Sequence, residues 1–129
     1  MQSELFTKGA KRLSEVVGLP EKEAVESLKT IALDVDKYIV EFCFAEIYSR
    51  DGLSLQEREI ITLTSLVTQG GCDSQMEFHI KASLNVGISA EKIIEIFIHC
   101  IPYAGFPRVR NAVKIAGKVF SEKNIILSN

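Results

Sequence analysis

The side chains of this sequence that could carry out thiol or acid–base chemistry gather on both sides of a double glycine, Gly70–Gly71. After the glycines, polar residues recur every three or four positions, which places Cys72, Gln75 and His79 on one face of a helix. Cys72 stands at the start of that helix, where unpaired N–H groups and the positive end of the dipole favour a thiolate, although Asp73 opposes this effect. The alternative is a small apolar residue in a tight turn.

A second candidate is an acid–base pair formed by Glu59 and His79. If the segments before and after the glycines pack as an antiparallel hairpin, Glu59 lies near the far end of the following helix, and His79 lies about two turns into that helix. A carboxylate beside an imidazole fixes its tautomer, and together they form a proton relay. We expect the imidazole, the acid and possibly the Cys72 sulfur to face one hollow. The alternative is a histidine satisfied within the core and an Arg58–Glu59 pair solvated at the helix start.

Several other functions are disfavoured by the sequence. Neither His-Glu-x-x-His nor Cys-x-x-Cys is present, so we expect no metal site. The 15 Lys and Arg residues against 17 Asp and Glu residues predict no nucleic-acid partner. No apolar run approaches the roughly 20 residues of a membrane helix. The first residues do not resemble a secretory signal, and three widely spaced cysteines do not suggest a disulfide framework, so we expect a cytoplasmic protein.

The elements that must position these side chains all have helical periodicity. Apolar residues recur at helical spacing in six segments, namely 5–17, 24–48, 55–68, 73–85, 90–101 and 107–120. Within the second segment Asp34 is a possible internal cap; Ser89 is expected to cap the fifth segment and Pro102 to end it. We therefore predict an all-α single domain over residues 1–129, a helical bundle around a central hairpin, with residues 1–33 as an N-terminal helical extension.

Five blocks of the sequence resemble the carboxymuconolactone decarboxylase family, in order and at the usual spacings over residues 35–120. The blocks are Leu53–Ile60, His79–Gly87, Glu91–Glu95, Pro102–Pro107 and Asn111–Ala112. The resemblance implies a helical bundle of the alkylhydroperoxidase D type that assembles as a homo-oligomer, a trimer or hexamer. It also implies a carbon–carbon lyase that decarboxylates a small molecule, 4-carboxymuconolactone in the name-giving members. If the lactone itself accepts the electrons, no metal or organic cofactor is needed.

The resemblance also suggests roles for single residues. His79 would donate the proton and Glu59 would orient it. One of three arginines would hold a substrate carboxylate: Arg58, Arg108 or Arg110. Gln75 matches the decarboxylase branch at the position four residues before the histidine, and Tyr103 could donate a hydrogen bond to the oxyanion or only pack.

A thiol-dependent antioxidant is the alternative function. The sister branch that resembles alkylhydroperoxidase D uses a Cys-x-x-Cys pair followed by a histidine. Here Cys72 matches the first cysteine, but Gln75 occupies the second position. A dithiol cycle would therefore need Cys43 or Cys100 as its resolving thiol. A third hypothesis is a non-catalytic oligomeric scaffold.

Self-association also has support that does not depend on the resemblance. The segment Ile60–Val67 is apolar on most sides, whereas a small domain buries only roughly 60–70% of its surface. Such apolar faces commonly form subunit interfaces, so we expect a homo-oligomer.

Overall fold

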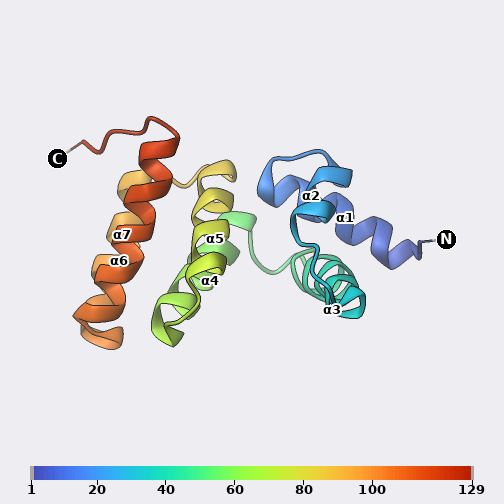
Figure 1. Ribbon diagram of the computed structural model, residues 1–129, viewed down its shortest axis with the longest axis horizontal. Helices are drawn as coiled ribbons and strands as arrows, with labels where there is room; N and C mark the ends of the chain where they lie inside the picture. Colours follow the sequence, from blue (N-terminus) through green and yellow to red (C-terminus); the bar gives the residue numbers. More distant parts are fainter. Residues whose placement is uncertain (1, 129) are drawn as a thin grey trace. The chain divides into compact units, whose positions relative to one another are not determined.

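The computed structural model describes residues 2–128, and all regular elements within them are helices, as predicted (Figure 1). The chain divides between residues 55 and 56 into two compact units. The elements of the first unit are α1 (Glu4–Val17), α2 (Glu21–Ser27), α3 (Leu33–Tyr38) and the π-helix η1 (Ile39–Ile47). Those of the second are α4 (Leu55–Gln69), α5 (Asp73–Asn85), α6 (Ala90–Ala104) and α7 (Phe106–Glu122). None of these helices is long and apolar enough to cross a membrane.

In the first unit, α1 packs closely against η1. Ser3 caps α1 by accepting a hydrogen bond from the backbone N–H of Phe6, and Gly18 ends the helix in the left-handed conformation at φ 76°. The helices approach most closely at Gly9, where a Cβ atom would lie 2.0 Å from the carbonyl oxygen of Val40. This position therefore has no room for any side chain.

The segment at residues 24–48, expected to be either one long helix or two, is divided into three elements. It divides into α2, α3 and η1, with a loop between α2 and α3. The expectation that Asp34 would be the internal cap is wrong, because α3 starts after Ala32 without a side-chain cap. Instead Asp36 reaches back to the loop and accepts hydrogen bonds from the backbone N–H and the hydroxyl of Thr30, the latter at 2.7 Å.

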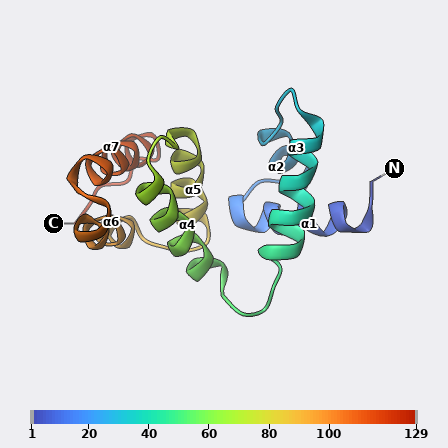
Figure 2. The same ribbon diagram turned by 90° about the horizontal axis from the view of Figure 1, so that it is seen from below.

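In the second unit, α4 and α5 form the predicted hairpin, and α7 packs against both α5 and α6 (Figures 1 and 2). Gly70 and Gly71 reverse the chain with φ values of 71° and 67°, which side-chain-bearing residues rarely adopt. Apolar side chains from all four helices form the core, among them Leu63, Val67, Ile80, Ile93, Phe97 and Val119. The core fixes which faces of α4 and α5 meet.

The two ends of α6 differ in how well they were predicted. Ser89 caps the start as expected, since its hydroxyl accepts a hydrogen bond from the N–H of Lys92 at 3.1 Å. Pro102, however, does not end the helix, which continues to Ala104. A proline near the C-terminal end removes a single backbone hydrogen bond, and the left-handed Gly105, at φ 93°, ends the helix instead.

Candidate active site

The structure brings Glu59 of α4 and His79 of α5 into direct contact. The His79 Nδ1 atom lies 2.7 Å from the Glu59 Oε1 atom, a short hydrogen bond across the hairpin. The side chain of Glu59 is completely buried, whereas that of His79 keeps 15% of its surface exposed. The carboxylate is thus shielded from water and the imidazole is reachable from outside.

The contact with Glu59 determines which nitrogen of the imidazole is left for chemistry. The contact occupies Nδ1, so Nε2, on the other side of the ring, is the nitrogen that a substrate could meet. The ring of Phe78 approaches the imidazole edge-on, with 5.1 Å between the ring centres. One turn further along α5, the buried Ser83 hydroxyl donates a hydrogen bond to the His79 carbonyl oxygen at 2.6 Å. Its adjacency to His79 along the chain was the only signal by which the Phe78 contact could have been predicted.

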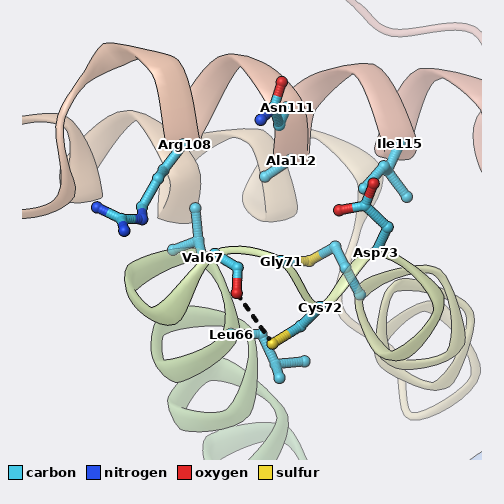
Figure 3. Close-up of a pocket in the computed structure, with 11 residues that line it drawn as sticks. Leu66, Val67, Gly71, Cys72, Asp73, Arg108, Asn111, Ala112 and Ile115 are labelled. Atoms are coloured by element: carbon cyan, nitrogen blue, oxygen red, sulfur yellow. Dashed lines mark hydrogen bonds between the residues drawn. The ribbon is translucent and has the colours of Figure 1, made fainter.

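Cys72 lines a small pocket beside the glycine bend, and the expectation that its sulfur and the pair face one hollow stays a prediction. Its thiol lies beside Leu66 and donates a hydrogen bond to the Gly70 carbonyl oxygen at 3.3 Å (Figure 3). The pocket it lines has a volume of about 30 Å³, which suits water rather than an organic substrate. Neither Glu59 nor His79 lines this pocket. The physical reason is that Cys72 sits at the cap position of α5, where its side chain turns back onto the glycine bend.

The arginines proposed to bind substrate lie in three different places. Arg58 is half-buried on α4, next in sequence to Glu59. Arg108 extends from α7 over the glycine bend and lines the Cys72 pocket together with Asn111 (Figure 3). Arg110 lies on another face of α7, along a groove with α6.

Gln75 and Tyr103 are both exposed at the surface of the second unit. Gln75 is exposed on α5, one turn before His79. Tyr103 is 78% exposed near the end of α6 and lines a groove between α4 and α6, with its ring 5.8 Å from that of His99. The groove includes Ile60 but neither Glu59 nor His79.

Within residues 2–128, none of the three cysteines forms a disulfide. Cys100 is buried in the core, as expected of a packing residue, and Cys43 is half-buried in η1. Among residues 2–128, no group of three or more His, Cys, Asp or Glu side chains is arranged to hold a metal ion.

A comparison with known protein families agrees with this architecture, a helical bundle in which two helices joined by a double-glycine turn carry a Glu–His pair. The model of the carboxymuconolactone decarboxylase family matches residues 34–118, so the chain belongs to this family. It is 29% identical over 121 residues to the 4-carboxymuconolactone decarboxylase of Acinetobacter baylyi, covering 93% of this chain and 90% of that protein. It is 24% identical over 119 residues to a nitrosuccinic acid decarboxylase of Metarhizium robertsii, covering 92% of this chain and 82% of the relative.

Proposed function

We propose that this protein is an enzyme that removes carbon dioxide from a small carboxylated substrate of the lactone type, with Glu59 and His79 as its acid–base pair. The observation that carries the proposal is the 2.7 Å contact between a fully buried carboxylate and a partly exposed imidazole. Family membership and two relatives named as decarboxylases support the reaction type.

Glu59 is proposed to position His79 rather than to touch the substrate. Because the carboxylate is buried, its hydrogen bond to Nδ1 is not weakened by competing water. The bond holds the ring in one tautomer and one orientation. A substrate must then approach at Nε2, the nitrogen on the opposite side of the ring.

The reaction itself requires a group that accepts an electron pair and a group that donates one proton. When the bond between the substrate carbon and its carboxylate breaks, carbon dioxide leaves and the electron pair moves toward the lactone carbonyl, giving an enolate. Protonated His79 then returns one proton from Nε2 to carbon and takes another from solvent to begin the next cycle. Hydrogen-bond donors near the carbonyl oxygen would stabilise the developing charge.

Further side chains are proposed to hold the substrate. Arg58 is the first choice for a carboxylate because it is next to Glu59 and half-buried, and guanidinium groups bind carboxylates with two parallel hydrogen bonds. Gln75 lies one turn before His79 on α5 and is a candidate for the carbonyl oxygen. Arg108 and Tyr103 stay weaker candidates, because each lines a pocket that excludes the pair.

The test is carbon dioxide release from 4-carboxymuconolactone and from nitrosuccinate. We expect His79→Ala to lower kcat by about 10²-fold or more, the usual contribution of a positioned acid–base group. Glu59→Gln keeps the shape of the side chain and should cause a smaller loss, mainly in kcat, with an altered pH profile. Full turnover by both variants would refute the assignment.

Cys72→Ser is the matched control and also addresses the thiol-dependent alternative. The variant should release carbon dioxide at the wild-type rate if the Glu59–His79 pair carries the chemistry. Loss of peroxide reduction in this variant, together with no decarboxylation by the wild type, would favour the antioxidant function. Inactivity of the wild type in both assays, over a range of small carboxylic acids, would favour the non-catalytic scaffold.

A further inference from the structure

A side chain closes the open end of the α4–α5 hairpin, opposite the glycine bend. The Gln56 Nε2 atom, in the first turn of α4, donates a hydrogen bond to the carbonyl oxygen of Val86 at 2.9 Å. Val86 is the cap residue that follows α5, so the bond joins two residues that are 30 positions apart in the sequence. A single amide group thus connects the start of one helix to the end of the other.

The turn that carries the acceptor has a defined backbone structure. The N–H of Gly87 bonds to the carbonyl oxygen of Leu84 at 3.1 Å. The N–H of Ile88 bonds to the carbonyl oxygen of Ser83 at 3.0 Å, which completes the pattern of a Schellman motif. Gly87 has a φ of 97°, and a Cβ atom there would lie 3.0 Å from the Gln56 Nε2 atom. The glycine therefore allows both the left-handed turn and the approach of the amide.

The same turn is connected to His79 through α5. The buried Ser83 takes part in the turn, and its hydroxyl donates a hydrogen bond to the His79 carbonyl oxygen at 2.6 Å. On α4, Gln56 precedes Glu59 by three residues, so both lie on one face of the helix. On α5, Val86 follows His79 by seven residues, about two turns. The Gln56 bond and the Glu59–His79 contact thus join the same sides of the two helices.

We propose that Gln56 is a positioning residue for the acid–base pair. Its hydrogen bond fixes how far α4 is displaced along α5, and this brings the Glu59 carboxylate to the His79 Nδ1 atom. The inference rests on the proposed function, since it assigns Gln56 a role in the same site.

Other features of the hairpin do not fix this displacement by themselves. Among the described residues, the backbones of α4 and α5 approach each other closely at few positions. The bend at the other end consists of Gly70 and Gly71, and glycine restricts the backbone least of all residues. The apolar contacts of the core are not directional, whereas a hydrogen bond specifies both a distance and an angle.

The exposure of Gln56 allows its effect on the pair to be separated from an effect on folding. The side chain is exposed, and a hydrogen bond that exchanges with water contributes little to the free energy of unfolding. Loss of this bond should therefore leave the fold intact while α4 shifts along α5. Circular dichroism and the urea midpoint verify that each variant folds.

The first test measures carbon dioxide release from 4-carboxymuconolactone by the full chain. Gln56→Met keeps the length of the side chain but removes the donor. We expect kcat to fall by about 10-fold and KM to change by less than about twofold, because a displaced acid–base group impairs the chemical step more than binding. Gln56→Lys supplies another N–H donor and should recover most of the lost kcat. Gln69→Met makes the matched change at the exposed last residue of α4 and should behave like the wild type.

A double-mutant cycle tests whether Gln56 acts through the pair. In the Glu59→Gln background the contact with His79 is already altered. Gln56→Met should then lower kcat by less than about twofold. The full 10-fold loss in that background would mean that Gln56 does not act through Glu59.

A second readout does not depend on activity. The sequence has two histidines, and the imidazole nitrogen resonances of His79 and His99 report the tautomer of each ring. At a pH where both rings are neutral, wild-type His79 should hold its proton on Nδ1, and Gln56→Met should give a mixture of tautomers. His99, on α6, should be the same in both proteins and serves as an internal reference.

The two readouts distinguish the failure of this inference from failure of the proposed function. A wild type without decarboxylase activity, whose His79 tautomer nevertheless changes in Gln56→Met, would refute the reaction and support the positioning role. An unchanged His79 spectrum in Gln56→Met would overturn the inference. So would wild-type kcat in Gln56→Met, or an equal loss of kcat in Gln56→Met and Gln56→Lys.

Discussion

At the scale of single residues, the contrast between two carboxylates of the second unit is informative. Glu59 is fully buried and its oxygen meets an imidazole, whereas Glu77 lies at the surface and meets the ammonium group of Lys118 at 2.7 Å. A buried carboxylate loses much hydration free energy, and proteins retain one chiefly where it is hydrogen-bonded. A surface ion pair contributes little to stability. Burial therefore supports the proposal that Glu59, and not Glu77, is the functional acid.

The Glu77–Lys118 pair nevertheless predicts a pH dependence of stability. The hydrogen bond from Lys118 lowers the pKa of Glu77, and the same contact raises the pKa of Lys118. A lowered carboxyl pKa stabilises the fold above the unfolded-state value of about 4.3 and loses this effect as pH falls through the folded-state pKa. The lysine contribution disappears only at alkaline pH, as pH rises through its raised pKa.

We therefore expect Lys118→Ala to lower the urea midpoint slightly between pH 6 and pH 8. The difference from wild type should vanish as the pH falls below about 4. Lys123→Ala, which removes an exposed lysine at the end of α7, should show no such change over the acid range. A difference between wild type and Lys118→Ala that persists undiminished into the acid range would contradict the assignment of this ion pair.

The residue types and their spacing were enough to select Glu59 and His79 but not to establish their contact. Helical spacing gives the face on which a side chain lies, and the double glycine predicts the reversal. The crossing of α4 and α5 depends on the packing of Leu63, Val67 and Ile80, which periodicity does not specify. For the same reason the sequence could not decide whether Cys72 faces the same hollow as the pair.

At the scale of elements, the glycine bend offers a matched pair of substitutions. Both glycines have positive φ, but a Cβ at Gly70 would lie 2.7 Å from the Arg108 Nε atom, whereas a Cβ at Gly71 would meet nothing within 4 Å. Gly71→Ala should thus cost only backbone strain, about 1 kcal/mol. Gly70→Ala should cost more, about 2 kcal/mol, because Arg108 must also move.

Urea denaturation of the two variants measures the difference, and Arg108→Ala tests its cause. In the Arg108→Ala background the extra cost of Gly70→Ala should disappear, leaving both glycine variants equally destabilised. If the extra cost is unchanged without Arg108, the contact between the bend and α7 is not its source.

The sequence was enough to predict which segments form helices, but it was less informative about where each helix ends and about the π-helical conformation of η1. The Ser89 cap and the end of the first segment at residue 17 are both confirmed. Pro102 does not end α6, because a single missing N–H does not end a helix near its last turn. Asp34 does not cap α3, and the side chain that bonds to the preceding loop is that of Asp36, which accepts a hydrogen bond from the N–H of Thr30. The wide winding of η1 has no periodic signature in a segment this apolar.

At the scale of the whole molecule, each compact unit holds one helical glycine in a contrasting environment. Gly9, in the first unit, touches the backbone of η1, and Gly117, in the second, is exposed on α7 with open space around it. Gly9→Ala should destabilise the first unit by about 3 kcal/mol, since the backbone of Val40 must be displaced. Gly117→Ala should stabilise α7 by about 0.5–1 kcal/mol, because alanine is the better helix former.

Hydrogen exchange resolved by residue is the suitable measurement, because it reports where each change acts. Faster exchange in α1 and η1 is expected for Gly9→Ala, and slower exchange in α7 for Gly117→Ala. An unchanged rate in α1 and η1 would mean that the helices can separate at Gly9 without loss, contrary to the close approach described above.

The depth of Glu59 has a consequence for how protons travel. Water and buffer molecules cannot collide with a carboxylate that has no surface of its own, whereas the partly exposed ring bonded to it can relay protons between this acid and the bulk. The imidazole that we propose as the proton donor therefore also lies between the buried acid and the solution, and a substitution at His79 should change how fast this acid exchanges protons with the medium.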